Sequence, residues 1–298
     1  MPWRRSRRPY PILVSEIMLQ QTQVERVEPK WRAFLKAFPS LNRLAQAPRR
    51  DVIVLWDGLG YNLRAVRLHL LAQRISRERH GRLPRTLEEL RALPGVGPYT
   101  ASALACFAFG VDTPVVDTNI ERVLRRLFAA DPSDPDAPIT KRRGATLAAA
   151  LLPAGRSRDW NLALMDLGAQ VCAPRQPRCG ACPLAAWCTA RAAFAAPRRQ
   201  AGSQPRSPST PGGPRRLSRR PAVRFENSNR YYRGRIVKLL RSLAPHESVP
   251  LSQLGRRIKA DFTVADRAWL GKELRKMARE GLLEVRRKNG RSHVAMPS

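Results

Sequence analysis

Residues 93–100 have the sequence Leu-Pro-Gly-Val-Gly-Pro-Tyr-Thr, in which a valine separates two glycines between two stretches of helical periodicity. Glycine tolerates positive φ, so this pattern predicts a tight turn that joins two helices. The backbone N–H groups at the start of the second helix can bind a phosphate group with help from the helix dipole. We therefore expect Gly95, Val96 and Gly97 to contact a nucleic-acid backbone.

The chain on either side of this turn has a helical pattern. Apolar residues recur at helical spacing through residues 1–188, with short Gly- and Pro-containing breaks and no alternating strand pattern. The 298 residues leave room for about two domains, and a hydrophobic fraction of 43% is sufficient for a buried core. The sequence therefore predicts a mainly α-helical core over residues 1–190.

Four cysteines follow this turn within a span of 17 residues, in the pattern C-x6-C-x2-C-x5-C: Cys172, Cys179, Cys182 and Cys188. Four thiolates in one loop can saturate the four irons of a [4Fe–4S] cluster. Zinc is the alternative, although zinc modules usually contain two close cysteine pairs and this loop has one. The fifth cysteine, Cys106, lies in an apolar stretch and is expected to be a buried core thiol.

The charge of the chain points to a polyanionic partner. Lys and Arg number 55 against 23 Asp and Glu, which gives a formal net charge of +32. Such a charge favours binding to nucleic acid through counterion release. No apolar run approaches the roughly 20 residues needed to cross a bilayer, and Glu16 interrupts the only N-terminal apolar stretch. We expect no membrane partner, and a cytoplasmic, nucleoid-associated monomer.

The last third of the chain divides into two segments. Residues 197–224 combine Pro, Ser, Gly and Arg with almost no large apolar residue, which predicts a flexible basic linker. Residues 225–298 then show three amphipathic stretches, at 231–243, 251–258 and 265–280, and a hairpin pattern around Asn289-Gly290. Three helices followed by a basic hairpin predict a winged-helix-like α+β module.

Together these motifs resemble the helix-hairpin-helix DNA glycosylases related to endonuclease III. The resemblance rests on the Gly-Val-Gly turn, the cysteine loop and Val-Val-Asp-Thr-Asn at 115–119, and it covers about residues 1–190. Ser-Glu-Ile-Met-Leu-Gln-Gln-Thr at 15–22, with Pro-Trp-Arg at 2–4 and Gly-Leu-Gly-Tyr at 58–61, resembles the adenine DNA glycosylase (MutY) branch. The resemblance implies a two-lobed core that binds double-stranded DNA containing a mismatch or an oxidised base, with the target base extruded.

The resemblance also assigns the chemistry. Glu16 matches the family acid that protonates the departing adenine, a role that needs a pKa raised by burial beside Ile17 and Met18. Asp117 matches the carboxylate that stabilises positive charge on the deoxyribose. Tyr99 stands where bifunctional relatives have a nucleophilic lysine. A tyrosine cannot form a Schiff base, so little or no lyase activity is expected.

Further residues are implied to contact DNA or the base. Gln20 and Gln21 match the segment that fills the space of the extruded base. The matched motifs add Trp3, Arg4, Tyr61, Asn62 and Leu162 to the DNA- and base-binding set.

Two alternatives remain at this point. Leu162 replaces a glutamate that many adenine glycosylases have before the cysteine loop, and with Asn62 it resembles the G:T-mismatch thymine glycosylases. The chain could therefore remove thymine or uracil opposite guanine instead of adenine opposite guanine or 8-oxoguanine. A non-catalytic iron–sulfur DNA-binding regulator is the second alternative, and the presence of Glu16 and Asp117 disfavours it.

Overall fold

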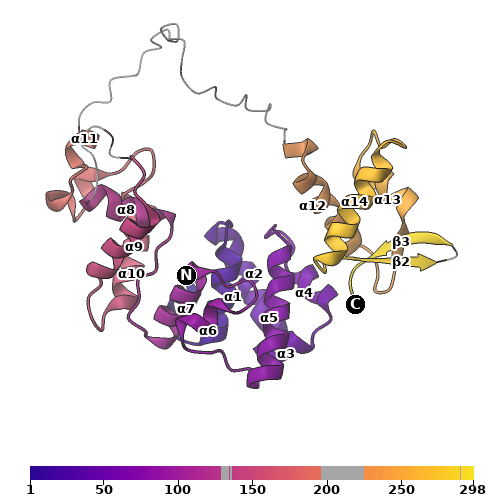
Figure 1. Ribbon diagram of the computed structural model, residues 1–298, viewed down its shortest axis with the longest axis horizontal. Helices are drawn as coiled ribbons and strands as arrows, with labels where there is room; N and C mark the ends of the chain where they lie inside the picture. Colours follow the sequence, from indigo (N-terminus) through magenta and orange to yellow (C-terminus); the bar gives the residue numbers. More distant parts are fainter. Residues whose placement is uncertain (129–133, 135, 196–224, 289) are drawn as a thin grey trace, which may run out of the picture. The chain divides into compact units, whose positions relative to one another are not determined.

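The computed structural model describes residues 1–298 except 129–133, 135, 196–224 and 289, so the predicted linker lies outside the described residues. The described elements are mainly helices, with one three-stranded sheet near the C-terminus (Figure 1). This confirms the predicted mainly helical class. The chain divides into two compact units. Unit 1 comprises Met1–Pro84, Ala92–Gly95 and the described part of Leu217–Ser298, and unit 2 comprises Arg85–Arg91 and the described part of Val96–Arg216.

The N-terminal part of unit 1 is a set of helices around an aromatic core. Phe34 lies edge-on to Phe38 and Trp56, with ring centroids 5.0 and 6.0 Å apart, and both Phe34 and Trp56 are fully buried. Such edge-to-face pairs add to the free energy of burying large apolar surfaces. The elements are η1 (Pro2–Arg5, a 3₁₀ turn), α1 (Pro9–Leu19), α2 (Val24–Ala37), α3 (Leu41–Gln46), α4 (Arg49–Leu55) and α5 (Leu63–Arg79).

The C-terminal part of unit 1 contains the three helices and the hairpin that the sequence predicts, and also a 3₁₀ turn and a short strand that it does not. They are η5 (Phe225–Asn227, a 3₁₀ turn), α12 (Asn229–Arg241), β1 (Ser248–Pro250), α13 (Leu251–Ile258), α14 (Asp266–Arg279), β2 (Glu284–Lys288) and β3 (Arg291–Ala295). The strands pair antiparallel in the order β1-β3-β2, with Val249 and Val285 both opposite the buried Val294. The additional strand, β1, has only three residues, too few to show an alternating pattern.

Both parts of unit 1 share one hydrophobic cluster. Ile53 of α4 and Val66 of α5 belong to the same buried cluster as Ile236, Leu240 and Met277 of the C-terminal part. Polar contacts join the same elements: Arg241 in α12 forms an ion pair of 2.5 Å with Asp57. The C-terminal part therefore packs directly onto α4 and α5.

Unit 2 is also helical. Its core contains Ile120, Val123, Leu124 and Leu127 on one face of α8, packed with Leu164 of α10. Its elements are α6 (Leu87–Arg91), α7 (Pro98–Phe109), α8 (Thr118–Phe128), α9 (Lys141–Ala150), α10 (Ser157–Asp166), the one-turn π-helix η2 (Leu167–Val171), the 3₁₀ turns η3 (Cys179–Ala181) and η4 (Ala185–Trp187), and α11 (Arg191–Ala195).

In neither unit do the described residues form a helix with the length and apolar character that crossing a bilayer requires.

Candidate functional site

Glu16 lies in the interior of α1, the most apolar helix of unit 1. The helix begins with Pro9 at its first position, where a missing N–H costs nothing, and all residues from Tyr10 to Met18 are buried. Glu16 itself is 7% exposed, and its neighbours Ile17 and Met18 are buried as predicted. The structure therefore places this carboxyl group inside the protein, with limited access to water.

The end of α1 is held by a buried arginine, Arg64 of α5. One guanidinium nitrogen, Nη1, donates to the carbonyl oxygens of Ile17, Met18 and Gln20, at 2.6–2.9 Å. The other, Nη2, donates to the carbonyl of Leu59 at 2.8 Å, to the Thr22 hydroxyl at 3.0 Å and to the Gly60 carbonyl at 3.1 Å. These bonds satisfy the last carbonyls of α1, which no helical N–H can reach, and join them to the loop before α5.

Arg64 keeps its charge despite its burial. Burial lowers the pKa of Arg64 to about 10, partly offset by Tyr61, so the group stays protonated at neutral pH. The guanidinium also lies 5.5 Å from the ring centroid of Trp56 and 5.6 Å from that of Tyr61. The sequence reasoning missed this residue, because an arginine on a helix gives no sign that it points into the protein.

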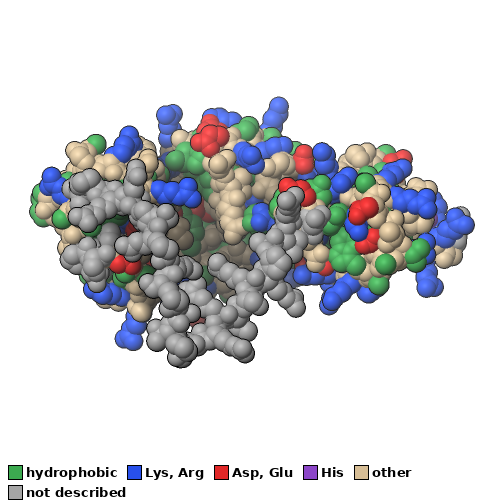
Figure 2. Space-filling view, turned by 90° about the horizontal axis from the view of Figure 1, so that it is seen from above, with side chains coloured by type: hydrophobic (Ala, Val, Ile, Leu, Met, Phe, Trp, Pro, Cys, Tyr) green, Lys and Arg blue, Asp and Glu red, His purple; other side chains and the backbone are tan. Residues whose placement is uncertain are grey.

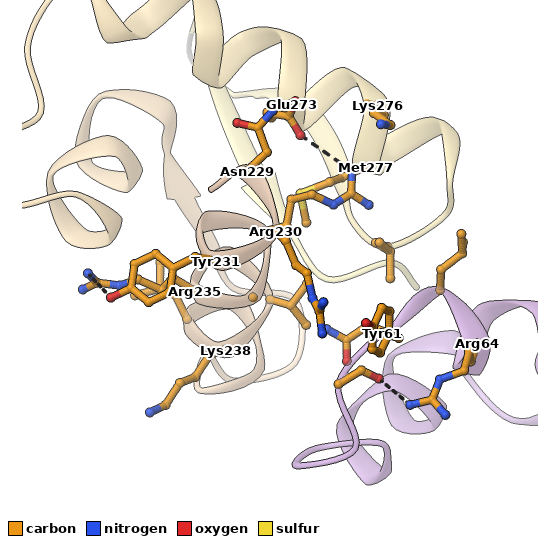
Figure 3. Close-up of a pocket in the computed structure, with 18 of the residues that line it drawn as sticks. Tyr61, Arg64, Asn229, Arg230, Tyr231, Arg235, Lys238, Glu273, Lys276 and Met277 are labelled. Atoms are coloured by element: carbon orange, nitrogen blue, oxygen red, sulfur yellow. Dashed lines mark hydrogen bonds and ion pairs between the residues drawn. The ribbon is translucent and has the colours of Figure 1, made fainter. Parts of the chain in front are cut away.

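Four of the predicted DNA-contacting residues of unit 1 line a groove together with this arginine. Gln21 has φ of +57° and Tyr61 φ of +45°, left-handed conformations that are uncommon for residues other than glycine. Tyr61 is 40% exposed, and the Asn62 side-chain oxygen accepts a bond of 2.7 Å from Arg241. Gln20, Gln21, Tyr61 and Asn62 line one open groove of about 1300 Å³ (Figure 3).

Trp3 and Arg4 lie at the N-terminus of the same unit. Trp3 is 5% exposed, and its ring packs edge-on against Trp31 with centroids 5.6 Å apart. Packing thus accounts for the position of Trp3. Arg4 is half-buried beside it. A contact of either residue with DNA stays a prediction.

The predicted glycine turn joins α6 to α7. Gly95 has φ of +80°, and a Cβ added there would lie 3.0 Å from Cβ of Arg67, so a side chain would be both strained and crowded. Val96 is buried, whereas Gly97 is exposed and begins α7 without a side-chain cap. Apart from its two chain neighbours, no residue in the described part of the chain has an atom within 4 Å of a Cβ added to Gly97. The first turn of α7 is therefore approachable by a phosphate group.

Asp117 caps the start of α8 in unit 2. Its Oδ1 accepts the backbone N–H groups of Asn119 at 2.9 Å and Ile120 at 2.7 Å, and its Oδ2 accepts from the Asn119 side chain at 3.2 Å. Aspartate is a preferred residue at this position, because its side chain satisfies N–H groups that lack a helical partner. The cap fixes the orientation of the carboxylate.

The segment that leads to Asp117 is fixed by Asn161 of α10. This buried amide donates to the Thr113 carbonyl at 3.0 Å and accepts from the Val115 N–H at 2.9 Å. The sequence reasoning selected its neighbour Leu162, which is half-buried, and did not identify Asn161. Tyr99 is half-buried in the first turn of α7. Glu16 belongs to unit 1 and Asp117 and Tyr99 to unit 2, so their proximity stays a prediction.

All four cysteines of the predicted cluster loop line one hollow, together with apolar residues such as Val123, Leu127 and Phe194. The buried Arg126 donates to the Cys172 sulfur at 3.5 Å and to the carbonyl oxygens of Ala173 and Pro174 at 2.8 and 2.9 Å. No three of the described His, Cys, Asp or Glu side chains are close enough together to hold one metal ion. The hollow thus presents four thiols and a cation that can stabilise negative sulfur.

Cys106 does not belong to this group. It is fully buried in α7, as expected for a core thiol, and burial raises the pKa of its thiol.

Known proteins resemble this chain in sequence. The family model described as "HhH-GPD superfamily base excision DNA repair protein" matches residues 14–147. An adenine DNA glycosylase of Mycolicibacterium smegmatis is 40% identical over 242 residues, which cover 81% of this chain and 75% of that protein. The adenine DNA glycosylase of Homo sapiens is 44% identical over 200 residues, 64% of this chain and 36% of that protein.

Solved structures resemble the chain in fold. A thermostable thymine-DNA glycosylase matches with a TM-score of 0.60 and 34% identity, over 65% of this chain and 88% of that one. A trapped endonuclease III–DNA covalent intermediate matches with a TM-score of 0.56 and 23% identity, over 63% and 86% of the two chains, which shows the fold alone. By its sequence identity and coverage, the chain belongs to the adenine DNA glycosylase family within the HhH-GPD superfamily of base excision DNA repair proteins.

Proposed function

We propose that this protein is a monofunctional DNA glycosylase that removes adenine mispaired with guanine or 8-oxoguanine. The observation that carries the proposal is the 40% identity over three quarters of the M. smegmatis adenine DNA glycosylase. The buried Glu16 and the fixed Asp117 supply the two carboxyl groups that this reaction needs. The partner is double-stranded DNA, bound by a monomer.

Glu16 acts as the general acid. It transfers its proton to N7 of the extruded adenine, so that the base leaves with the electron pair of the C1′–N9 bond as a neutral molecule. The burial of Glu16 within α1 limits the access of water to its carboxyl group, as suits a group that must pass its proton to the base.

Asp117 stabilises the positive charge that develops on the deoxyribose when the bond breaks. Its cap of α8 holds the carboxylate before the substrate binds, so little reorganisation is needed during the reaction. Water then adds a hydroxyl group to C1′, and the proton that this water loses replaces the one that Glu16 gave to the base, so the acid is restored. Tyr99 has no amine to replace this water, so the product is an abasic site in an intact strand.

The four cysteines of residues 172–188 would hold a [4Fe–4S] cluster. The donor set fits, because four thiols line one hollow and Arg126 lies beside them to offset negative charge on sulfur. When bound, the cluster would cross-link the loop, which has only short 3₁₀ turns of its own. The purified protein should be brown with broad visible absorption. A colourless protein that contains zinc would contradict the assignment.

Residues 225–298 would form a winged-helix-like DNA-binding module after a linker at 197–224, and residues 1–190 the glycosylase core. The order of helices α12, α13 and α14 followed by the β2–β3 hairpin supports this division. The charge of residues 189–298, with 26 Lys and Arg against 7 Asp and Glu, supports contact with phosphate groups. Such contacts supply affinity but not base identity.

An excision assay on four duplexes tests the proposed function. Duplexes that contain A:8-oxoguanine, A:G, T:G or U:G are incubated with the protein, and alkali then cleaves any abasic site. We expect cleavage of the two adenine duplexes after alkali and almost none without it. Excision confined to T:G and U:G would overturn the proposal in favour of a thymine or uracil glycosylase, for which Leu162 is the motivating residue. A regulator without catalysis would cleave none of the four.

A further inference from the structure

The open groove in unit 1 has two walls that come from opposite ends of the chain. One wall is the end of α1 and the loop before α5, with Gln21 and Tyr61, and the other is α12 with neighbouring residues of α13 and α14 (Figure 3). We call it the basic groove. Its walls are fixed to each other, because Arg241 of α12 bonds to Asp57 and Asn62, and Arg50 of α4 donates to the Leu243 carbonyl at 2.6 Å.

Cations dominate the lining of this groove. Eight Lys and Arg residues line it against one acidic residue, Glu273. Arg64 donates to carbonyl oxygens, and Arg233 pairs with Glu273 and Glu280. The other six are exposed and form no ion pair with a carboxylate among the described residues: Arg67, Arg230, Arg235, Lys238, Arg257 and Lys276. A groove with this surplus of exposed positive charge fits a strand of linked phosphates.

The groove also presents a ring to its occupant. Tyr61 is 40% exposed, and the guanidinium of Arg230, which reaches across from α12, lies 4.0 Å from its ring centroid (Figure 3). Aromatic and guanidinium groups both stack on nucleobases, so a tyrosine beside arginines is typical of a site for a strand with an unstacked base.

The position of the groove distinguishes between the two strands of the duplex. It is lined by Gln20 and Gln21 at the end of α1, the residues proposed to fill the space of the extruded base, whereas Glu16 is not among its lining residues. The nucleotide that undergoes cleavage must reach Glu16. The occupant of the groove is therefore the strand that keeps the unpaired base.

We propose that the basic groove binds the DNA strand opposite the extruded adenine and that Arg235, Lys238 and Lys276 of the C-terminal part contact its phosphates. The inference rests on the proposed function, because it needs an extruded adenine to define the two strands. The C-terminal part, through α12, would then contact the strand opposite the extruded adenine.

Two triple variants of the full chain test this assignment. The groove triple is Arg235→Gln, Lys238→Gln and Lys276→Gln. The matched triple is Lys36→Gln, Arg43→Gln and Arg82→Gln, which removes the same charge from exposed positions of the N-terminal part of unit 1, outside the groove and outside the proposed DNA-binding module. All six side chains are exposed, so both variants should fold, and thermal unfolding checks this. Figure 2 shows how widely Lys and Arg are spread over one face of the molecule, which is why a charge-matched control is needed.

The first measurement is the salt dependence of binding. The probe is a duplex with 8-oxoguanine opposite an adenine whose sugar is 2′-fluorinated, since the fluorine opposes positive charge on the sugar and prevents cleavage. Because the groove triple lacks three cations that neutralise phosphates, its slope of log K against log salt should be shallower by about 2.7. We expect a change of less than about 1 in the matched triple. Equal slopes in the two triples would overturn the proposal.

The second measurement identifies the strand. Methylphosphonates replace three phosphates next to the lesion, either on the 8-oxoguanine strand or on the adenine strand. Neutralising the 8-oxoguanine strand should weaken binding of the unmodified chain and of the matched triple, but cause little further loss in the groove triple. If methylphosphonates on the adenine strand, and not those on the 8-oxoguanine strand, cause little further loss in the groove triple, the assignment is overturned. Absence of adenine excision by the unmodified chain would show that the proposed function has failed, separately from the groove.

Discussion

The two carboxyl groups of the proposed chemistry are held in contrasting ways. Glu16 lies within an apolar helix and is 7% exposed, whereas Asp117 begins a helix and is half-buried. Asp117 accepts two backbone N–H groups through one oxygen, so hydrogen bonds hold its carboxylate in position. Burial limits the water around a group that must deliver a proton, and anchoring fixes a group that must act on the sugar from one place. The two surroundings thus match the two proposed roles.

Replacement of the acid should have the largest effect. Glu16→Gln keeps the size of the side chain but removes its transferable proton, so adenine excision should fall by about 10²–10⁴-fold. Single-turnover excision on an A:8-oxoguanine duplex measures the rate, and urea unfolding tests whether the fold is intact. A variant that folds and excises adenine within a few-fold of the original rate would break the assignment of Glu16 as the acid.

Replacement of Asp117 should have a slightly smaller effect on the excision rate. Two variants can separate its role in the reaction from its role as the cap of α8. Asn is a good helix cap, so Asp117→Asn should keep the start of α8 but lose about 10²–10³-fold in excision rate. Asp117→Ala should lose activity similarly and also lower the free energy of unfolding by about 1 kcal/mol. Full excision activity of Asp117→Asn would mean that Asp117 serves only as the cap of α8, and would contradict its proposed role in stabilising charge on the sugar.

Removing the side chains that support the two carboxyl groups should destabilise the protein by different amounts. Arg64 serves six oxygen acceptors at the end of α1 and in the adjoining loop. Asn161 serves two backbone groups before α8 and one carbonyl of its own helix, α10. Arg64→Ala should therefore lower the free energy of unfolding by at least about 3 kcal/mol, and Asn161→Ala by about 1–3 kcal/mol.

The control for both is Arg67→Ala, an exposed arginine three residues after Arg64, with an expected change within about 0.5 kcal/mol. Urea unfolding measures all three variants. A loss for Arg64→Ala no greater than that of the control would contradict the role of Arg64 as the support of α1.

Local patterns in the sequence predict a large part of this molecule. The helical class, the glycine turn with positive φ at Gly95, and the helix at 251–258 follow from periodicity and backbone preference, which neighbouring residues determine. The burial around Glu16 follows from the apolar character of α1. The four cysteines are recognisable because their spacing is itself the signal.

Other features depend on contacts between residues that are distant in the sequence, so no local sequence pattern predicts them. Arg64 and Asn161 look like ordinary polar helix residues until the elements opposite them are known. Trp3, selected from its motif, packs on Trp31 in the interior. The packing of the C-terminal part onto α4 could not be predicted either, because Ile53 and Val66 have the pattern of any helix that faces a core.

That shared cluster has a consequence for biosynthesis. The cluster that contains Ile53 and Val66 is complete only when it also includes residues such as Leu283 and Met296. The ribosome makes the first pair long before the second, and contacts between distant segments close slowly because the intervening chain must first be ordered. Unit 1 therefore cannot finish folding until Met296 has been translated, and a chain released before that point would leave apolar side chains of α4 and α5 open to aggregation.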